Sequence, residues 1–225
     1  MQIWSHAFLN EAPSALCIVE ERIWLGAQEE IGGNRLIAEI EGGGKTLYVA
    51  VGSPIPMQND GYDRVFAPTW LLDQLGLRGS GEDVVVRWRS EEFFPEATRI
   101  VLRPHDSAFY HADAKEELER ALTQLGVLQA GTTILLPLEV LGGYEIPFDV
   151  VCTEPANIVL MQGDEVALEF EAALDGAAEA QAAEPPPMAE TQEMLPVAAE
   201  PEPVGHTLGG TVRRMADGRP WNPWR

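Results

Sequence analysis

Residues 64–75 read Arg64-Val65-Phe66-Ala67-Pro68-Thr69-Trp70-Leu71-Leu72-Asp73-Gln74-Leu75, a run that passes from an apolar triplet through a small-residue turn into a short helical turn. A fainter copy, Arg22-Ile23-Trp24-Leu25-Gly26-Ala27-Gln28-Glu29-Glu30-Ile31-Gly32, lies 42 residues earlier. Self-similarity at a fixed period indicates repeated structural units. We therefore expect two units of strand, loop and short helix, interlocked in one barrel.

Short apolar segments, separated by Gly, Pro and Asp clusters, continue on both sides of this run. Such a pattern is typical of strands. Eight segments qualify, and they cover residues 36–40, 46–51, 83–88, 99–102, 132–136, 145–152, 158–161 and 166–170.

One long helix is predicted among these strands. It begins near Asp113 as the N-cap, with Glu116 three residues later as in a capping box, and it ends at Gly126. Its apolar residues recur at helical spacing, and they are Leu118, Ala121, Leu122 and Leu125. A single long helix among many strands predicts an α+β fold in which β-structure dominates.

The charge of the chain narrows the classes of partner. Its 225 residues carry 36 Asp and Glu against 15 Lys and Arg, a formal charge of -21. Nucleic-acid backbones are bound by basic residues that displace counterions, so we expect no nucleic-acid partner. No basic leader precedes an apolar run, and no stretch approaches the ~20 apolar residues of a membrane span. We expect a soluble, unsecreted protein without membrane insertion.

Residues that carry chemistry are scattered in the sequence. Cys17 and Cys152 lie far apart, which predicts neither a disulfide framework nor a four-ligand zinc site and favours a reducing compartment. The spacing of His105 and His111 puts no pair on one helical face, so no metal site is expected. We find no catalytic motif and expect neither catalytic residues nor a cofactor. Because triads form in space, an unrecognised active site stays open as an alternative.

Three short motifs have structural interpretations. The run Gly42-Gly43-Gly44-Lys45-Thr46 lacks the first glycine of a phosphate-binding loop and leads into a strand pattern, which predicts a hairpin turn. The run Phe93-Phe94-Pro95 is interpreted as a hinge that packs against both cores. The doublets Glu91-Glu92 and Asp164-Glu165 are interpreted as solvated charge on strand edges, because neighbouring strand residues point to opposite faces.

The C-terminal part has a different composition. Residues 173–204 contain nine Ala, six Pro and six Glu, with no aromatic and no basic residue. Such a segment buries too little apolar surface to offset its ordering entropy, which predicts a disordered acidic linker. Residues 205–225 then carry a basic pair and two tryptophans. We interpret them as a linear motif offered to a partner; the alternative is a frayed terminus.

The stretch 65–170 resembles the N-terminal domain of the ubiquitin fusion degradation family, the adaptors that recruit substrates to the valosin-containing AAA ATPase. The likeness is carried by the run 66–75 and by features downstream of it in matching order. These features are Phe109, the run Leu118-Glu119-Arg120-Ala121-Leu122, Leu128, Gly131, the run Tyr144-Glu145-Ile146, and the segment from Pro155 to Glu171.

This resemblance implies a double-psi β-barrel for residues 1–97 and a smaller mixed α/β subdomain for 98–172. It also implies that the folded part binds ubiquitin or polyubiquitin chains. The family's further partners are the AAA ATPase and a cofactor of the nuclear-protein-localisation type. Its role in ubiquitin-dependent degradation, including degradation at the endoplasmic reticulum, implies a location in the cytoplasm or nucleus.

The tail resembles the family's ATPase-binding motif in part. Gly205, Leu208, Gly209 and Gly210 fit that motif, whereas prolines occupy the positions of its aromatic residue and first glycine. Trp221 or Trp224 is a candidate substitute for the aromatic anchor. We therefore expect a non-enzymatic adaptor that brings ubiquitylated clients to the ATPase. Two alternatives stay open: a shortened competitor that blocks such a complex, and an enzyme built on the same scaffold.

Overall fold

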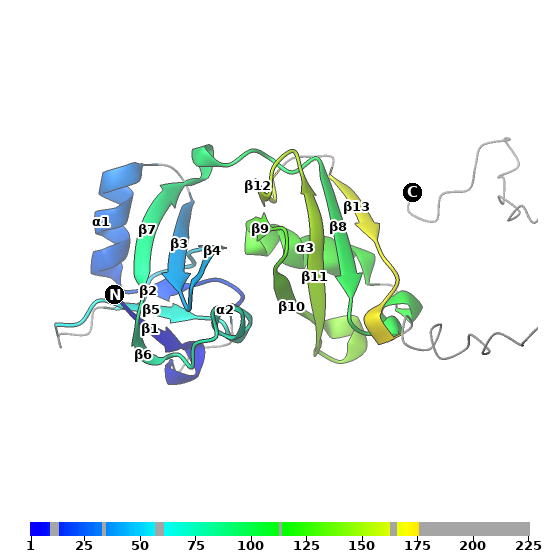
Figure 1. The fold of residues 1–225 in the computed structure, drawn as a ribbon, viewed down its shortest axis with the longest axis horizontal. Coiled ribbons are helices and arrows are strands. Elements are labelled where there is room, and N and C mark those ends of the chain that lie inside the picture. The colour runs from blue at the N-terminus through cyan, green and yellow to red at the C-terminus, as the bar shows by residue number, and fades with distance from the viewer. Residues whose placement is uncertain (10–13, 33–34, 57–60, 113, 163–165, 176–225) are drawn as a thin grey trace, which may run out of the picture. The chain divides into compact units, whose positions relative to one another are not determined.

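The computed structural model describes residues 1–9, 14–32, 35–56, 61–112, 114–162 and 166–175 (Figure 1). The chain divides into two units, Met1–Pro185 and Pro186–Arg225, and every described residue belongs to the first. This part has a mixed α+β architecture dominated by strands, which confirms the predicted class. Residues 176–225, which include most of the predicted linker 173–204 and the whole predicted motif 205–225, lie outside the described residues.

Helices connect the strands at several points. Within the described ranges there are three α-helices: α1 (Glu21–Ile31), α2 (Thr69–Leu75) and α3 (Lys115–Leu125). The same part of the chain contains four short 3-10 helices, which are η1 (His6–Phe8), η2 (Glu91–Phe93), η3 (Ser107–His111) and η4 (Glu139–Leu141).

The strands of the first half are β1 (Gln2–Ser5), β2 (Ile18–Val19), β3 (Leu36–Gly42), β4 (Lys45–Ala50), β5 (Arg64–Ala67), β6 (Ser80–Asp83) and β7 (Val85–Ser90). Those of the second half are β8 (Arg99–Pro104), β9 (Val127–Gln129), β10 (Thr133–Leu138), β11 (Tyr144–Glu154), β12 (Ile158–Leu160) and β13 (Ala167–Phe170).

The first half forms two sheets, in the orders β2-β5-β1-β6 and β4-β3-β7. Within the first sheet β1 and β5 are parallel. Isolated parallel bridges, Cys17 to Val51 and Glu20 to Ile55, connect the neighbourhood of β2 to the segment that follows β4. On the other side β6 runs into β7 through the single residue Val84. Within the described ranges neither sheet closes on itself, so the closed double-psi barrel predicted for residues 1–97 is not confirmed.

The second half forms a four-stranded sheet in the order β10-β11-β8-β13 and a two-stranded sheet of β12 and β9. Strand β13 runs parallel to β8, and the other pairs are antiparallel. Helix α3 buries Leu118, Leu122 and Leu125 and contacts β10. It ends at Gly126 as predicted, whereas its N-cap is Ala114, and the predicted cap Asp113 lies outside the described residues.

The run that opens the sequence forms the expected strand, turn and helix. Strand β5 ends at Ala67, and Pro68 is the N-cap whose carbonyl accepts the first N–H groups of α2. The helix ends at Gly76, which takes a left-handed conformation with φ 69°. The fainter copy is different, because residues 22–25 belong to α1 and the strand, β2, precedes them. That part of the prediction was wrong: Ile23, Ala27 and Ile31 recur at helical spacing and pack on the core.

The predicted strands are otherwise close to those in the structure. The segment 83–88 is split, because β6 ends at Asp83 and β7 begins at Val85. The glycine run at 42–44 is the predicted hairpin turn, with Gly42 paired to Lys45 and positive φ angles at Gly43 and Gly44. Strands β1, β2 and β9 were not predicted, nor were residues 80–82 of β6 or helix α1.

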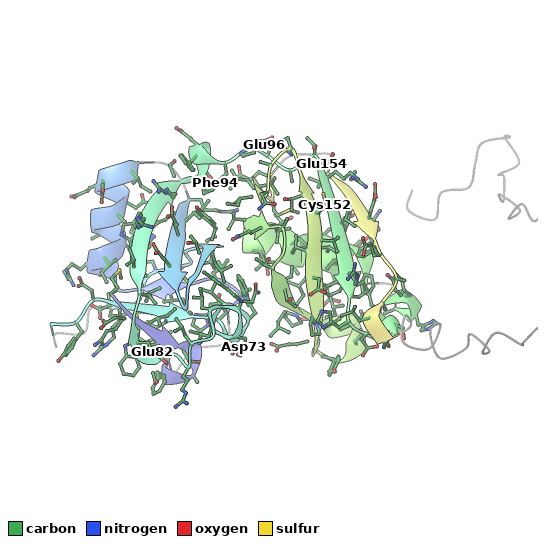
Figure 2. The ribbon with its side chains drawn as sticks, viewed as in Figure 1. Asp73, Glu82, Phe94, Glu96, Cys152 and Glu154 are labelled. Carbon is green, nitrogen blue, oxygen red and sulfur yellow. The ribbon has the colours of Figure 1, made fainter. Side chains whose placement is uncertain are left out.

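Apolar side chains from both halves share the main hydrophobic core. One cluster includes Ile3 and Leu71 from the first half and Leu118 and Phe148 from the second. A second cluster places Phe94 with residues of both halves, which are Ile37, Ala50, Val127 and Leu160. The prediction that the run 93–95 packs against both cores is confirmed for Phe94, which Figure 2 labels on the connection between β7 and β8. Its neighbour Phe93 is 66% exposed.

Candidate functional site

A hollow of about 230 Å³ opens on the outer face of the sheet that contains β1 and β5. Four side chains line it, and they are Trp4, Phe8, Arg64 and Phe66. We call these four residues, together with neighbouring Tyr62, the aromatic hollow. Three of the five rest on two adjacent parallel strands, and this backbone fixes their spacing.

Strand alternation explains why these residues gather on one face. In the register of β1 and β5, Ile3 lies opposite Val65 and Trp4 lies opposite Phe66. Ile3 and Val65 are fully buried in the main core. Because successive strand residues point to opposite faces, Trp4 and Phe66 point to the other side of the sheet.

The rings and the guanidinium of the hollow contact one another. The ring centroids of Trp4 and Phe8 lie 5.1 Å apart in an edge-to-face arrangement. The guanidinium carbon of Arg64 lies 5.7 Å from the Trp4 centroid and 5.8 Å from the Tyr62 centroid, within the range of a cation–π interaction. Phe66 is buried against Ile18 and Ile55. Phe8 and Tyr62, in contrast, are 61% and 54% exposed.

Local backbone geometry holds these side chains in place. Ser5 caps η1 by accepting a hydrogen bond from the backbone of Ala7, and this turn presents Phe8 beside Trp4. His6 Nε2 lies 3.2 Å from the carbonyl oxygen of Phe66 and ties η1 to β5. Gly81 of β6 makes room for the indole, because a Cβ there would lie 2.8 Å from Trp4 Cζ2. A side chain at Gly81 would therefore displace Trp4.

The indole N–H of Trp4 is buried and has no hydrogen-bond partner in the described part of the chain. An unsatisfied buried donor costs roughly 1–3 kcal/mol. The ring is therefore held by packing against Phe8, Arg64 and Gly81. The unsatisfied donor therefore offsets part of the stability that the packing of this ring provides.

A second cluster of ionisable groups lies across β8, β10 and β11. His105 Nε2 is 2.8 Å from Asp149 Oδ1, and the hydroxyl of Thr133 donates to the same oxygen over 2.8 Å. Burial raises the pKa of Asp149, but the hydrogen bonds from His105 and Thr133 outweigh it and hold this pKa below its usual value. In a nucleophilic triad the histidine bridges the hydroxyl and the carboxylate. Here the carboxylate is the bridge, which suits a structural clamp between strands.

A third polar group covers the sheet β4-β3-β7. Glu39 is only 7% exposed, and it accepts hydrogen bonds from Arg87 Nη1 over 2.9 Å and from Arg89 Nε over 2.8 Å. Burial raises the pKa of Glu39, but these two arginines outweigh that effect and hold the pKa below its usual value. All three side chains are cross-strand neighbours, so the network is part of the sheet's stability.

The residues predicted from the sequence stand as follows. The tail motif, Gly205, Leu208, Gly209, Gly210, Trp221 and Trp224, lies outside the described residues. Both cysteines are free, and burial raises the pKa of the Cys17 thiol. Among the described residues, no group of three His, Cys, Asp or Glu side chains is placed to hold a metal ion. No helix within the described ranges is long and apolar enough to cross a membrane.

The aromatic hollow was not predicted from the sequence. Strand β1, which carries Trp4, has only four residues, too few to show an alternating pattern in the sequence. The pairing with Phe66 could not be read from it. The chain matches no protein-family model and no curated protein. Its function is therefore inferred from its own residues and from the resemblance described above.

Proposed function

We propose that this chain is a non-enzymatic adaptor whose folded part binds a protein partner. In line with the resemblance of residues 65–170, that partner is ubiquitin or a ubiquitin chain on a client protein. The tail from Gly205 to Trp224 engages a AAA ATPase of the valosin-containing type, and a cofactor of the nuclear-protein-localisation type joins the same complex. The place of action is the cytoplasm or nucleus.

The observation that carries a binding role is the aromatic hollow. Trp, Tyr and Arg are the residue types that dominate binding energy at protein interfaces. Here they stand on the outer face of strands whose inner face, through Ile3 and Val65, is fully buried. A rigid base of this kind lowers the entropy lost on binding. More than half of the surface of Phe8 and of Tyr62 is exposed, so both rings are accessible to another protein.

The proposed fold of residues 1–97 is a double-psi β-barrel. Two features support it. The parallel bridges at Cys17 and Glu20 connect the two sheets on one side, and the continuous passage from β6 to β7 connects them on the other. The units β2-α1 and β5-α2 also have the same order of strand and helix, as two interlocked copies require.

The proposed mechanism is tethering. A linker between a client-binding domain and an ATPase-binding motif raises the effective concentration of the client at the ATPase and requires no bond chemistry. In this mechanism the folded part binds the client, residues 173–204 are the linker, and residues 205–225 bind the ATPase.

Titration of the isotope-labelled full chain with ubiquitin chains tests the first half of the proposal. We expect saturable resonance shifts, and a complete lack of shifts at high ubiquitin concentration would refute ubiquitin as the partner. The titration does not require that the ubiquitin-binding surface is known beforehand, because each backbone amide gives its own resonance.

A pull-down of the ATPase tests the second half. The chain should be cut after Asp175, because Ala173 is buried and Asp175 accepts hydrogen bonds from Ser107. We expect this cut to abolish capture of the ATPase. Two full-length variants are tested alongside the shortened chain. Leu208→Ala tests the glycine-leucine motif, and the double change Trp221→Ala with Trp224→Ala tests the tryptophans. Unchanged capture by the shortened chain would show that the tail is not the docking element.

A further inference from the structure

Strand β13 is the last of the described strands, and side chains of two other elements hold it in place. It lies at the edge of its sheet, beside β8 (Figure 1). A short edge strand near the end of a folded region usually frays unless other groups hold it. Here side chains of β8 and η3 bind residues 169–175, and we call this set of contacts the C-terminal latch.

Two arginines of β8 bind acids at the end of β13 and just after it. Arg99 donates to both carboxylate oxygens of Glu169, over 2.9 Å from Nε and 2.8 Å from Nη2. Arg103 Nε donates to the carboxylate of Glu171 over 2.9 Å. Exposed ion pairs usually contribute little, but two parallel hydrogen bonds from one guanidinium fix the geometry of the pair. Both arginines therefore oppose separation of β13 from β8.

Helix η3, which follows β8, holds the chain where it leaves β13. The backbone N–H and the hydroxyl of Ser107 both donate to Asp175 Oδ2, over 2.9 and 2.8 Å. The hydroxyl of Tyr110 donates to the backbone carbonyl of Glu171. Between these two points, Ala173 is buried. Because these contacts lie between β13 and the rest of the chain, a force applied beyond Asp175 reaches them before it reaches the strand.

Loss of β13 would open the main hydrophobic core. Leu168 and Phe170 pack against that core, and the ring centroid of Phe170 lies 5.0 Å from that of Phe109. Phe109 in turn meets the fully buried ring of Phe148 edge to face. Removal of the strand would expose these side chains to water. Release of the C-terminal latch would therefore be the first step in unfolding from this end.

We propose that the C-terminal latch keeps the folded part intact when a AAA ATPase pulls on the chain beyond Asp175. The inference rests on the proposed function, in which the tail engages such an ATPase, and it adds how the adaptor stays folded while its client is unfolded. Resistance to pulling is governed by the rate of unfolding, and contacts that are broken in the transition state control that rate. The latch supplies such contacts at the point where the pull arrives.

Degradation of the full chain by a bacterial ATP-dependent protease, which unfolds its substrates from a tagged end, tests the proposal. The recognition peptide is added after Arg225 in one version and before Met1 in another. The latch variant is the double change Ser107→Ala with Tyr110→Phe, which removes two hydroxyl donors and leaves residues 169–175 unchanged. We expect degradation from the C-terminal tag to be about three- to tenfold faster in this variant. Degradation from the N-terminal tag should change by less than about twofold, because that pull arrives at β1.

The matched control is the double change Ser80→Ala with Tyr144→Phe. Ser80 also donates from its backbone N–H and its hydroxyl to one carboxylate, that of Glu82, but it lies in the first half. Tyr144 is an exposed tyrosine outside the latch. This control should not speed degradation from the C-terminal tag more than from the N-terminal tag.

Two outcomes of this experiment would overturn the proposal. Equal acceleration from both tags in the latch variant would show a general loss of stability, and no acceleration from either tag would show that the latch bears no load. Hydrogen exchange of the unsubstituted chain gives a measurement that requires no variant. The backbone amides of Ala167 and Glu171, which donate to carbonyls of Thr98 and Leu102, should be protected like those of β11. Exchange at the rate of an unprotected amide would show that the strand frays and would also contradict the proposal.

This inference and the proposed function can fail separately. A latch that passes the degradation test in a chain that captures no ATPase would refute the docking of the tail and leave the latch as a property of the fold. Capture of the ATPase by a chain whose latch fails the test would keep the proposed function and refute this inference.

Discussion

Glu39 of β3 lies directly opposite Arg87 of β7, and the arginine donates a hydrogen bond of 2.9 Å to the buried carboxylate. Arg89 binds the other oxygen of the same carboxylate. One buried acid thus links two positions of the neighbouring strand. Both arginines are partly exposed, so solvent screens part of the attraction.

We predict that Glu39→Gln lowers the free energy of unfolding by about 1–2 kcal/mol at pH 7. Because the folded protein holds the pKa of Glu39 below its usual value, this stabilisation is present above the unfolded pKa of about 4.3 and is lost as the pH falls through the lower folded value. Urea unfolding at several pH values measures it. Glu41→Gln, at an exposed acid paired with Arg87, should change stability by less than about 0.5 kcal/mol. A difference between Glu39→Gln and the unsubstituted chain that does not shrink as the pH is lowered through the acid range would contradict this explanation.

The hairpin glycines should respond very differently to the same change. A Cβ at Gly43 would lie 1.8 Å from the carbonyl oxygen of Leu75, whereas a Cβ at Gly44 meets nothing within 4 Å. Both residues have positive φ, which costs a side chain about 1–2 kcal/mol. We predict that Gly44→Ala costs about this amount and Gly43→Ala more than about 3 kcal/mol, as measured by chemical denaturation. Equal losses would mean that α2 does not abut the turn.

Neighbouring phenylalanines give a second matched pair. Phe94 is buried among residues of both halves, and its ring meets that of Tyr48 at 5.5 Å. We predict that Phe94→Ala costs about 3–5 kcal/mol, because it removes a core ring and leaves a cavity. Phe93→Ala, at a ring 66% exposed, should cost less than about 1 kcal/mol. Thermal unfolding, followed by circular dichroism, measures the difference between the two variants. Similar unfolding midpoints for both would contradict a role for Phe94 in packing the two halves together.

Two tryptophans differ in whether their indole N–H is satisfied. Trp70 Nε1 donates to the carbonyl of Ala15 over 3.2 Å, whereas the Trp4 donor is buried without a partner in the described part. We predict that Trp4→Phe changes stability by less than about 1 kcal/mol, because the lost packing is offset by removal of the unsatisfied donor. Trp70→Phe should cost about 2 kcal/mol or more. Denaturant titrations of both variants test this order, and the reverse order would contradict it.

The regular part of the fold was predictable because its signals are local. The run 64–75 contains its own strand, breaker and helix cap, and the glycine run 42–44 specifies a tight turn. Helix α1 was missed because Gly26 looked like a turn, although Ile23, Ala27 and Ile31 have helical spacing. Strands β1 and β2 have four and two residues, too few to show a period of two.

The aromatic hollow required information that a single sequence does not carry. Trp4 and Phe66 lie 62 positions apart and meet only because β1 and β5 pair in a particular parallel register. A shift of one residue would turn both rings into the core. Likewise, the pairing of β11 with β10 and β8 brings Asp149 to Thr133 and His105, each of which looks unremarkable alone.

The main hydrophobic cluster draws side chains from both halves of the described part. Unfolding of one half would expose apolar side chains of the other half. We therefore expect a single unfolding transition in calorimetry and no stable half-sized fragment in limited proteolysis. A substitution that unfolds the buried core, for instance at Phe148, would therefore remove the aromatic hollow as well, although the hollow belongs to the other half.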